Sequence, residues 1–310
     1  MVYTGADSYF AFGYETSFKS DSGSYDYLFG RNQRMNTNTI GNEAEVYYEL
    51  GGREGAGIVT KRFTGTIGIS AYLSGDSYSV FKIFFPDVST TDNGDGSYTH
   101  TLSPSKELKT VTVAQTYDGA TTFTRKYLGT VFNELTVDAR VGDIANVGLR
   151  GNFADETSDT NAITMPTSSE EPLTFADAVV ELPSGTTLTT IQNITVTIRN
   201  NSALYYTLGD RKAVGGYYGR YDYTASISLY LEDSTFIDYV KNGNKLTGMR
   251  IVFSNGETGA DKREFALEFS DIIIPQTTVN VTDVGRVIEQ SFNVSMKSAT
   301  VKITNNLASI

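Results

Sequence analysis

Few side chains in this sequence could do covalent chemistry. It has no cysteine, which excludes a thiolate nucleophile, a disulfide and a cysteine-ligated metal cluster. His100 is the only histidine, and because no nucleophile elbow lies near it, we interpret it as structural or solvent-facing. The acidic pairs are scattered through polar stretches, without the positioned carboxylates that acid–base catalysis needs. We therefore expect no catalytic residue, no bound metal and no cofactor.

Two glycine-rich stretches resemble ligand loops only at first sight. Residues 92–96 read Asp-Asn-Gly-Asp-Gly, but they lack the ligand spacing and the distant glutamate of a calcium loop. Residues 51–57 read Gly-Gly-Arg-Glu-Gly-Ala-Gly, but no Gly-Lys-Ser/Thr follows, and the stretch opens into a strand pattern. We interpret the first as a turn and the second as the start of a flexible loop over residues 51–61.

The composition indicates a globular protein. The 310 residues are 39% hydrophobic and 12% aromatic, which is enough to bury a core. No apolar run is long enough to span a bilayer and no secretion signal is recognisable at the start, so we expect no membrane insertion. The net charge of −11 argues against ordinary nucleic-acid binding, which uses clustered positive charge. It is compatible with a surface that DNA passes without binding.

Short alternating segments, many glycines and many tyrosines predict an all-β fold, mainly antiparallel. In residues 62–73, Ile67 and Ile69 fall on an apolar face, and polar residues fall on the other. Residues 220–231 repeat this pattern 158 positions later. The polar faces of the two strands carry Thr64, Thr66, Ser70, Asp222, Thr224, Ser226 and Ser228.

The repeat extends beyond these strands and predicts a duplicated unit. Residues 35–73 and 193–231 align without a gap and share 16 identities in 39 positions. The prediction is a first unit at 1–153 with an insertion near 82–109, an acidic linker at 154–172, and a second unit at 173–310, each with one short α-helix. We expect the insertion to be a long hairpin or loop. Asn36 and Asn38 stand where the second copy has apolar residues, so the two copies cannot bury that strand equally.

The duplicated core resembles the tail tube (major tail) proteins of long-tailed bacterial and archaeal viruses. The resemblance also rests on Ala-Phe-Gly-Tyr-Glu-Thr at 11–16, and on strand endings followed by Val-Gly-Asp at 141–143 or Val-Thr-Asp at 281–283. It implies β-sandwich units whose inner sheets join side by side into a closed barrel. Family members with one unit form hexameric rings. A chain with two fused units is therefore expected to build a pseudo-sixfold ring from three copies, with a hexamer of chains as the fallback.

The resemblance implies a structural virion protein rather than an enzyme. Its rings would stack into the tail tube, the conduit for viral DNA ejection, after assembly in the host cytoplasm. Its partners would be further copies of itself, other tail proteins at the tube ends, and double-stranded DNA in transient passage. We expect the polar strand faces to line the lumen, where hydroxyls and carboxylates would not retain phosphate. We expect contacts within and between rings at Gly51, Arg53, Gly57, Asp92, Gly94, Asp95, Gly209, Arg211 and Gly215.

Two other classes remain open at this stage. A carbohydrate-binding or adhesive β-sandwich is supported by the 20 tyrosines and by glycosylation sequons at Asn193, Asn200, Asn280 and Asn293. An enzyme on a β scaffold has less support, because no carboxylate pair stands out. A surface binder should be small and monodisperse, whereas a tube subunit should form rings or filaments.

Overall fold

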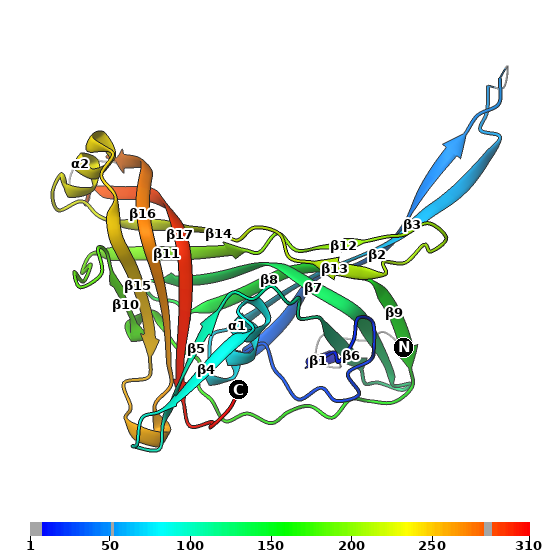
Figure 1. Cartoon of the computed structure of the whole chain (residues 1–310), viewed down its shortest axis with the longest axis horizontal. Helices are drawn as coiled ribbons and strands as arrows, with labels where there is room; N and C mark the ends of the chain where they lie inside the picture. Colours follow the sequence, from blue (N-terminus) through cyan, green and yellow to red (C-terminus); the bar gives the residue numbers. More distant parts are fainter. Residues whose placement is uncertain (1–7, 51–52, 282–286) are drawn as a thin grey trace.

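The computed structural model describes residues 8–50, 53–281 and 287–310, and shows a mainly antiparallel β protein (Figure 1). Every strand pairing among these residues is antiparallel, as the alternating patterns predicted. The strands are β1 (Ser8–Tyr14), β2 (Arg31–Tyr47), β3 (Gly57–Tyr72), β4 (Asp87–Asp92), β5 (Tyr98–Ser103), β6 (Val111–Tyr117), β7 (Phe123–Arg140), β8 (Asn146–Phe153), β9 (Asp155–Asp159), β10 (Ala178–Glu181), β11 (Ile191–Arg199), β12 (Ala203–Tyr205), β13 (Gly215–Tyr217), β14 (Asp222–Tyr230), β15 (Leu246–Ser254), β16 (Glu264–Asn280) and β17 (Glu289–Asn305).

Two short α-helices lie where the sequence predicted them. Helix α1 (Tyr78–Phe84) follows a 3₁₀ turn at Gly75–Ser77, and α2 (Thr235–Asn242) follows Asp233, whose carboxylate accepts a hydrogen bond from the Thr235 N–H at 2.8 Å. Gly243 ends α2 in the left-handed conformation, at φ 62°. Further 3₁₀ turns are η3 (Phe175–Asp177) and η4 (Gly259–Asp261).

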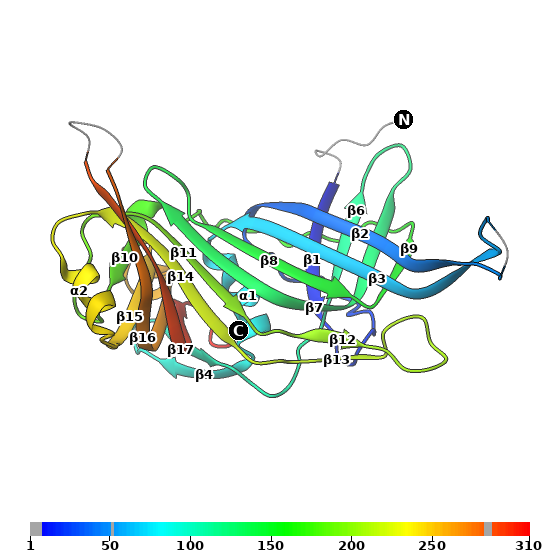
Figure 2. The same ribbon diagram turned by 90° about the horizontal axis from the view of Figure 1, so that it is seen from above.

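One long sheet runs through the whole molecule. Its strand order is β10-β15-β16-β17-β14-β11-β7-β8-β3-β2, with β1, β4, β5, β6 and β9 attached to it, and β12 and β13 form a separate pair. Figure 2 shows this row from β10 to the β2–β3 hairpin, and Figure 1 shows its strong twist. The two halves of the chain meet where β7 pairs with β11, for example Val137 with Val196.

The apolar faces form one continuous core that both halves share. Ile67 and Ile69 of β3 are buried, as are Ala225 and Ile227 of β14, which confirms the predicted alternation. Helix α1 extends this core across the halves, because the rings of Phe81 and Phe265 lie 5.6 Å apart between centroids. The predicted inequality also holds: Ile194, Val196 and Ile198 are buried, whereas Ile40 is 42% exposed.

Residues 82–109 contain the β4–β5 hairpin, which docks on the far half of the chain. Strand β5 pairs with β17, with His100 opposite Ile303. The His100 ring is fully buried, with Nδ1 2.8 Å from the Thr90 hydroxyl and Nε2 3.1 Å from Asn305 Oδ1. The interpretation of His100 as a structural residue is therefore correct, and the alternative that it faces solvent is wrong.

Residues 154–172 are packed along the molecule rather than free. Strand β9 within them pairs with β7, and Ile163 is buried. The Glu170 carboxylate accepts hydrogen bonds from the Arg263 guanidinium at 2.9 and 3.1 Å. These contacts fasten the segment to both halves.

Two hairpins leave the sheet at corresponding places in the two halves. We call residues 42–62 the first arm and residues 200–220 the second arm. The first arm continues β2 and β3 outward beyond the body (Figure 1), with Val46 opposite Ile58. The prediction of a loop over 51–61 was therefore wrong for residues 57–61, which form part of β3 because they pair with β2.

Candidate channel face and assembly surfaces

The structure places the predicted channel residues of both halves on one face of the long sheet. Thr66 and Ser226 are exposed, and the other members of the set are half-buried. Their neighbours along each strand point into the core, so the set lies on the face opposite the core. Strands β8, β7 and β11 separate β3 from β14. The members are Thr64, Thr66, Ser70, Asp222, Thr224, Ser226 and Ser228.

Polar residues on the intervening strands complete this face. Thr224 pairs with Thr197, Thr197 with Thr136, Thr136 with Gly148, and Gly148 with Ser70. The result is a row across five strands with a hydroxyl on four of them and glycine on β8, and we call the surface that it crosses the hydroxyl face. The sequence reasoning named only the two ends of this row. The same period-two alternation in residues 131–139 and 193–199 would have identified its middle.

Three arginines on the hydroxyl face lie close to carboxylates. The Arg199 guanidinium lies 2.7 Å from the Glu134 carboxylate, and Arg150 approaches the same carboxylate at 3.9 Å. Arg220 lies 2.9 Å from Asp222. The expected lining of hydroxyls and carboxylates therefore needs correction, because arginines also reach this face. Arg199, Arg150 and Arg220 have carboxylate partners, which reduces the positive field at this face. Arg34, opposite Ser70, and Arg140, opposite Asn193, are exposed and form no ion pair with a described residue.

The predicted contact residues at 92–95 form a tight exposed turn. The Gly94 N–H donates to Asp92 Oδ1 at 2.8 Å, and the Ser97 N–H donates to Asp95 Oδ1 at 3.0 Å. Gly94 has φ 78°, a conformation that glycine adopts without strain. The turn lies beside the β15–β16 turn, where the Asp95 carbonyl approaches Gly259. The interpretation of this stretch as a turn is confirmed.

The second arm is seated on the first half of the chain. The Arg211 guanidinium donates to the Lys61 carbonyl at 3.1 Å and to Asn42 Oδ1 at 2.8 Å. The Tyr206 hydroxyl donates to the Phe63 carbonyl at 3.0 Å. Arg211, which we expected to lie at a contact surface, is thus engaged within its own chain. Gly209 is exposed near the arm tip, whereas Gly215 is buried beneath the Tyr205 ring.

The first arm is far less engaged. Gly51 lies outside the described residues, Arg53 is exposed, and Gly57 lies beneath the Tyr47 ring. Two exposed ion pairs join its strands, one between Arg62 and Glu43 at 2.6 Å, and such pairs contribute little stability. The exposed apolar residues of the arm are Val46, Tyr47, Tyr48, Leu50, Ile58 and Val59.

Several stretches of strand edge are open among the described residues, and two of them bear on assembly. Among the described residues, β2 pairs with β3 alone, and residues 276–280 of β16 pair with β17 alone. Ile40 lies on the first edge and Val279, which is 37% exposed, on the second. Open edges present unpaired backbone groups and readily recruit another strand.

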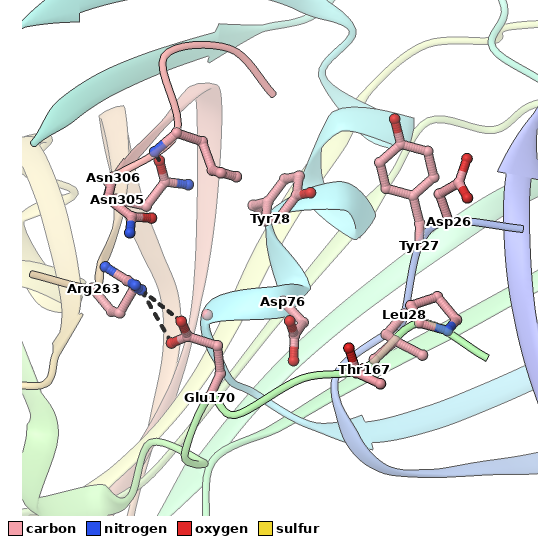
Figure 3. Close-up of a pocket in the computed structure, with 13 residues that line it drawn as sticks. Asp26, Tyr27, Leu28, Asp76, Tyr78, Thr167, Glu170, Arg263, Asn305 and Asn306 are labelled. Carbon is pink, nitrogen blue, oxygen red and sulfur yellow. Dashed lines mark hydrogen bonds and ion pairs between the residues drawn. The ribbon is translucent and has the colours of Figure 1, made fainter. Parts of the chain in front are cut away.

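A hollow beside the start of α1 is the clearest concavity near the junction of the halves (Figure 3). The Glu170–Arg263 ion pair lies on one side and Asp76 on the other. Burial, together with the nearby Glu170 carboxylate, raises the pKa of Asp76, although the Ser168 hydroxyl donates to it. These groups join three segments of the chain to one another.

Two further findings concern the described residues only. Residues 8–50, 53–281 and 287–310 contain no group of three or more side chains that could hold a metal ion. No helix in these ranges is long and apolar enough to cross a membrane.

Comparison with known proteins gives one family. The model of the family described as phage tail tube protein matches residues 5–296. A hybrid structure of the SPP1 tail tube, by solid-state NMR and cryo EM, is 11% identical with a TM-score of 0.32, and the overlap covers 43% of this chain and 79% of that chain. No curated protein matches the sequence.

Proposed function

The chain belongs to the phage tail tube protein family, and from that premise we propose that three copies close into a ring with pseudo-sixfold symmetry. The rings stack into the virion's tail tube, the conduit for viral DNA. The role is structural, without catalysis, and the other partners are tail proteins at the tube ends. Assembly takes place in the host cytoplasm. The observation that supports the trimer is the strand order, because one sheet contains two similar sets of four strands, so three chains would supply six sets.

The strand order supports the predicted duplication. From the open edge inward, the first half contributes β2-β3-β8-β7, and the second continues with β11-β14-β17-β16. Both sets contain the repeat at the same offset, because Asn38 pairs with Ile67 and Val196 pairs with Ala225. The outer pairs β1–β6 and β10–β15 flank β7 and β16 respectively. We infer two units, with residues 154–172 joining them.

The junction between the two units provides a template for the junction between chains. Stepping across the first unit, Ile69 pairs with Leu149, Leu149 with Leu135, and Leu135 with Ile198 of the second unit. Each of these side chains is buried. A strand at the position of Ile198 thus completes the first unit's sheet.

The second unit repeats these steps but ends at an open edge. Ile227, the counterpart of Ile69, pairs with Phe292, and Phe292 pairs with Thr277. The residue that corresponds to Ile198 is Ile40, on the open edge of β2. We therefore propose that Ile40 of one chain pairs with Thr277 of the next, and Asn38 with Val279. Because the two edges differ, the contact is head-to-tail and closes a ring when the rotation closes.

The hydroxyl face supports a role as the channel wall. Hydroxyl groups cover much of this face and carboxylates partner three of its arginines, so phosphate would gain little by staying. Contacts of this kind carry no sequence readout, which suits a conduit. The exposed turn at 92–96 is available for stacking between rings.

Ring formation is tested by electron microscopy of the purified full-length chain. We expect rings of three chains with six similar lobes, and stacks of such rings. Six chains per ring would contradict the trimer, and a stable monomer that never assembles would contradict the proposed function. The carbohydrate-binding alternative predicts that monomer, and the family match does not favour it.

The junction between chains is tested by Ile40→Asp. Ile40 is 42% exposed in the single chain, so the monomer should fold normally. In a ring the carboxylate would be covered without a partner, which costs several kcal/mol, so rings should be lost. Val179→Asp is the matched control, because Val179 is 44% exposed on β10, at the opposite end of the strand order from β2 and outside residues 276–280. Normal rings of the Ile40 variant would rule out this junction.

A further inference from the structure

The two arms have the same internal build. In the first, the Ala56 N–H donates to the Tyr47 carbonyl at 2.8 Å, and in the second the Val214 N–H donates to the Tyr205 carbonyl at 3.0 Å. Gly57 and Gly215 each lie beneath the tyrosine ring opposite. At the tips, Leu50 and Leu208 are fully exposed. The arms therefore correspond residue for residue at an offset of 158 positions.

The arms differ in what they touch. The second arm lies across β7 and β8 and ends against the base of the first arm. Besides the Arg211–Asn42 hydrogen bond and the Lys212–Asp155 ion pair, four contacts hold it. These are Arg211 to the Lys61 carbonyl at 3.1 Å, the Phe63 N–H to the Arg211 carbonyl at 2.8 Å, the Tyr206 hydroxyl to the Phe63 carbonyl at 3.0 Å, and the Arg62 guanidinium at 5.3 Å from the Tyr206 ring centroid. The first arm projects beyond the body (Figure 1).

The side chains that make these contacts are identical in the repeat. The gripping residues Tyr206 and Arg211 correspond to Tyr48 and Arg53 of the first arm. Tyr48 and Arg53 are exposed and make no hydrogen bond or ion pair with any described residue.

The receiving side is also repeated. Arg62 corresponds to Arg220, whose side chain is 86% exposed, and Phe63 corresponds to Tyr221. The backbone N–H and carbonyl of Tyr221 have no hydrogen-bond partner within the described ranges. We call the set of contacts between one arm and the base of the other arm a clasp. The chain contains one complete clasp, and it also contains, at two separate places, the two sides that a second clasp would need.

We propose that the first arm of each chain clasps the second unit of the next chain in the same ring. Tyr48 donates to the Tyr221 carbonyl, Arg53 donates to the Gly219 carbonyl, and Arg220 lies over the Tyr48 ring. Asn200, the counterpart of Asn42, is not part of this grip, because its amide is already bonded to Phe132 and Ser202. The inference rests on the proposed ring.

The direction of the clasp follows from the sheet. The second arm leans over the unit that lies beyond the edge of β11, which is the first unit of its own chain. The first arm leaves from β2, and in the ring the unit beyond β2 is the second unit of another chain. The arm therefore acts within a ring and leaves stacking to other surfaces. Each trimeric ring contains three clasps within chains and three between chains.

A crosslinking experiment tests the clasp directly, because the chain has no native cysteine. Tyr48→Cys with Arg220→Cys places thiols on the two sides of the interchain clasp. Tyr206→Cys with Arg62→Cys does the same for the clasp within the chain and is the matched control. Each double variant is treated with a flexible bismaleimide as assembled tubes and as dilute monomer, and is then separated under denaturing conditions.

The control pair should crosslink in both samples and remain monomeric in size. The interchain pair should crosslink only in tubes, as a ladder that stops at the number of chains in one ring. A ladder that continues past that number would show arms joining rings and overturn the inference. Intact tubes with a crosslinked control but no interchain ladder would also overturn it. In both cases the proposed tube function would stand, whereas the absence of rings in the wild-type chain would reject that function itself.

A second comparison decides the case in which the cysteine variants fail to assemble. Arg53→Ala removes a residue of the proposed clasp. Glu54→Ala is the control, because the corresponding residue of the second arm is Lys212 and the repeat therefore does not preserve the residue type at this position. Charged hydrogen bonds of this kind are worth enough to raise the protein concentration needed for rings by roughly tenfold. The Arg53 variant should show that shift and the Glu54 variant should not. Equal behaviour of the two variants would overturn the clasp.

Discussion

Lysines on the hydroxyl face should turn a passive channel wall into one that holds DNA. The perturbation is Thr66→Lys combined with Thr224→Lys, one position in each unit. Thr66 is exposed and Thr224 half-buried, and both side chains point away from the core. Lysine can extend from either position into solvent, so folding and ring formation should survive. A ring of three chains gains six positive charges, because each chain contributes both.

The magnitude follows from counterion release. Each lysine–phosphate contact steepens the dependence of log K on log salt by about 0.9, so six contacts give a slope of about −5 per ring. Raising the salt from about 50 to 200 mM should then weaken binding roughly a thousandfold per ring fully engaged. Wild-type tubes, in which three arginines on this face are paired with carboxylates, should retain far less DNA than the lysine variant at low salt.

The assay measures retention of short duplex DNA inside purified tubes over a salt series, and ejection rate in virions that carry the variant. Ala120→Lys with Asn242→Lys is the control, because it adds the same charge at the exposed β6–β7 turn and at the end of α2, away from the hydroxyl face and from the turn at 92–96. Salt-dependent retention by the first variant and not by the control is expected. Well-formed lysine tubes that retain no DNA at low salt would refute the placement of this face on the channel.

Three further outcomes are expected. Phe81→Ala should lower the free energy of unfolding by about 3–5 kcal/mol in a denaturant titration, because the ring is fully buried against Phe265. Asp76 has a raised pKa, so its favourable contribution to the free energy of unfolding is present below the unfolded-state pKa of about 3.9 and is lost as the pH rises through the folded-state pKa. Asp76→Asn, which cannot ionise, should therefore raise the melting temperature at pH 7 but not at pH 3. Deleting residues 93–96 and closing the turn should shorten the stacks seen by electron microscopy more than it destabilises the subunit, and normal stacks would remove this turn from the ring contact.

Local patterns in the sequence determined the strands, their faces and the helices. A period of two places Ile67 and Ile69 on the buried face whatever lies beyond the strand, because the backbone alternates its side chains. Gly243 ends α2 for an equally local reason, since glycine adopts the left-handed conformation at no steric cost. The repeat was likewise readable from residue types alone.

Only the tertiary structure decided which strands and surfaces meet. His100 bonds to Asn305, 205 positions away, because β5 happens to lie beside β17, and no pattern around either residue indicates that partner. The same holds for the two arms. Tyr48 and Arg53 of the first arm correspond to Tyr206 and Arg211 of the second, but the two pairs have different surroundings. Arg211 is hydrogen-bonded to the first arm because the unit that it leans on belongs to its own chain, and Tyr48 has no such partner because β2 is an open edge. Pairing between distant segments depends on the packing of the whole core, so a local pattern cannot determine it.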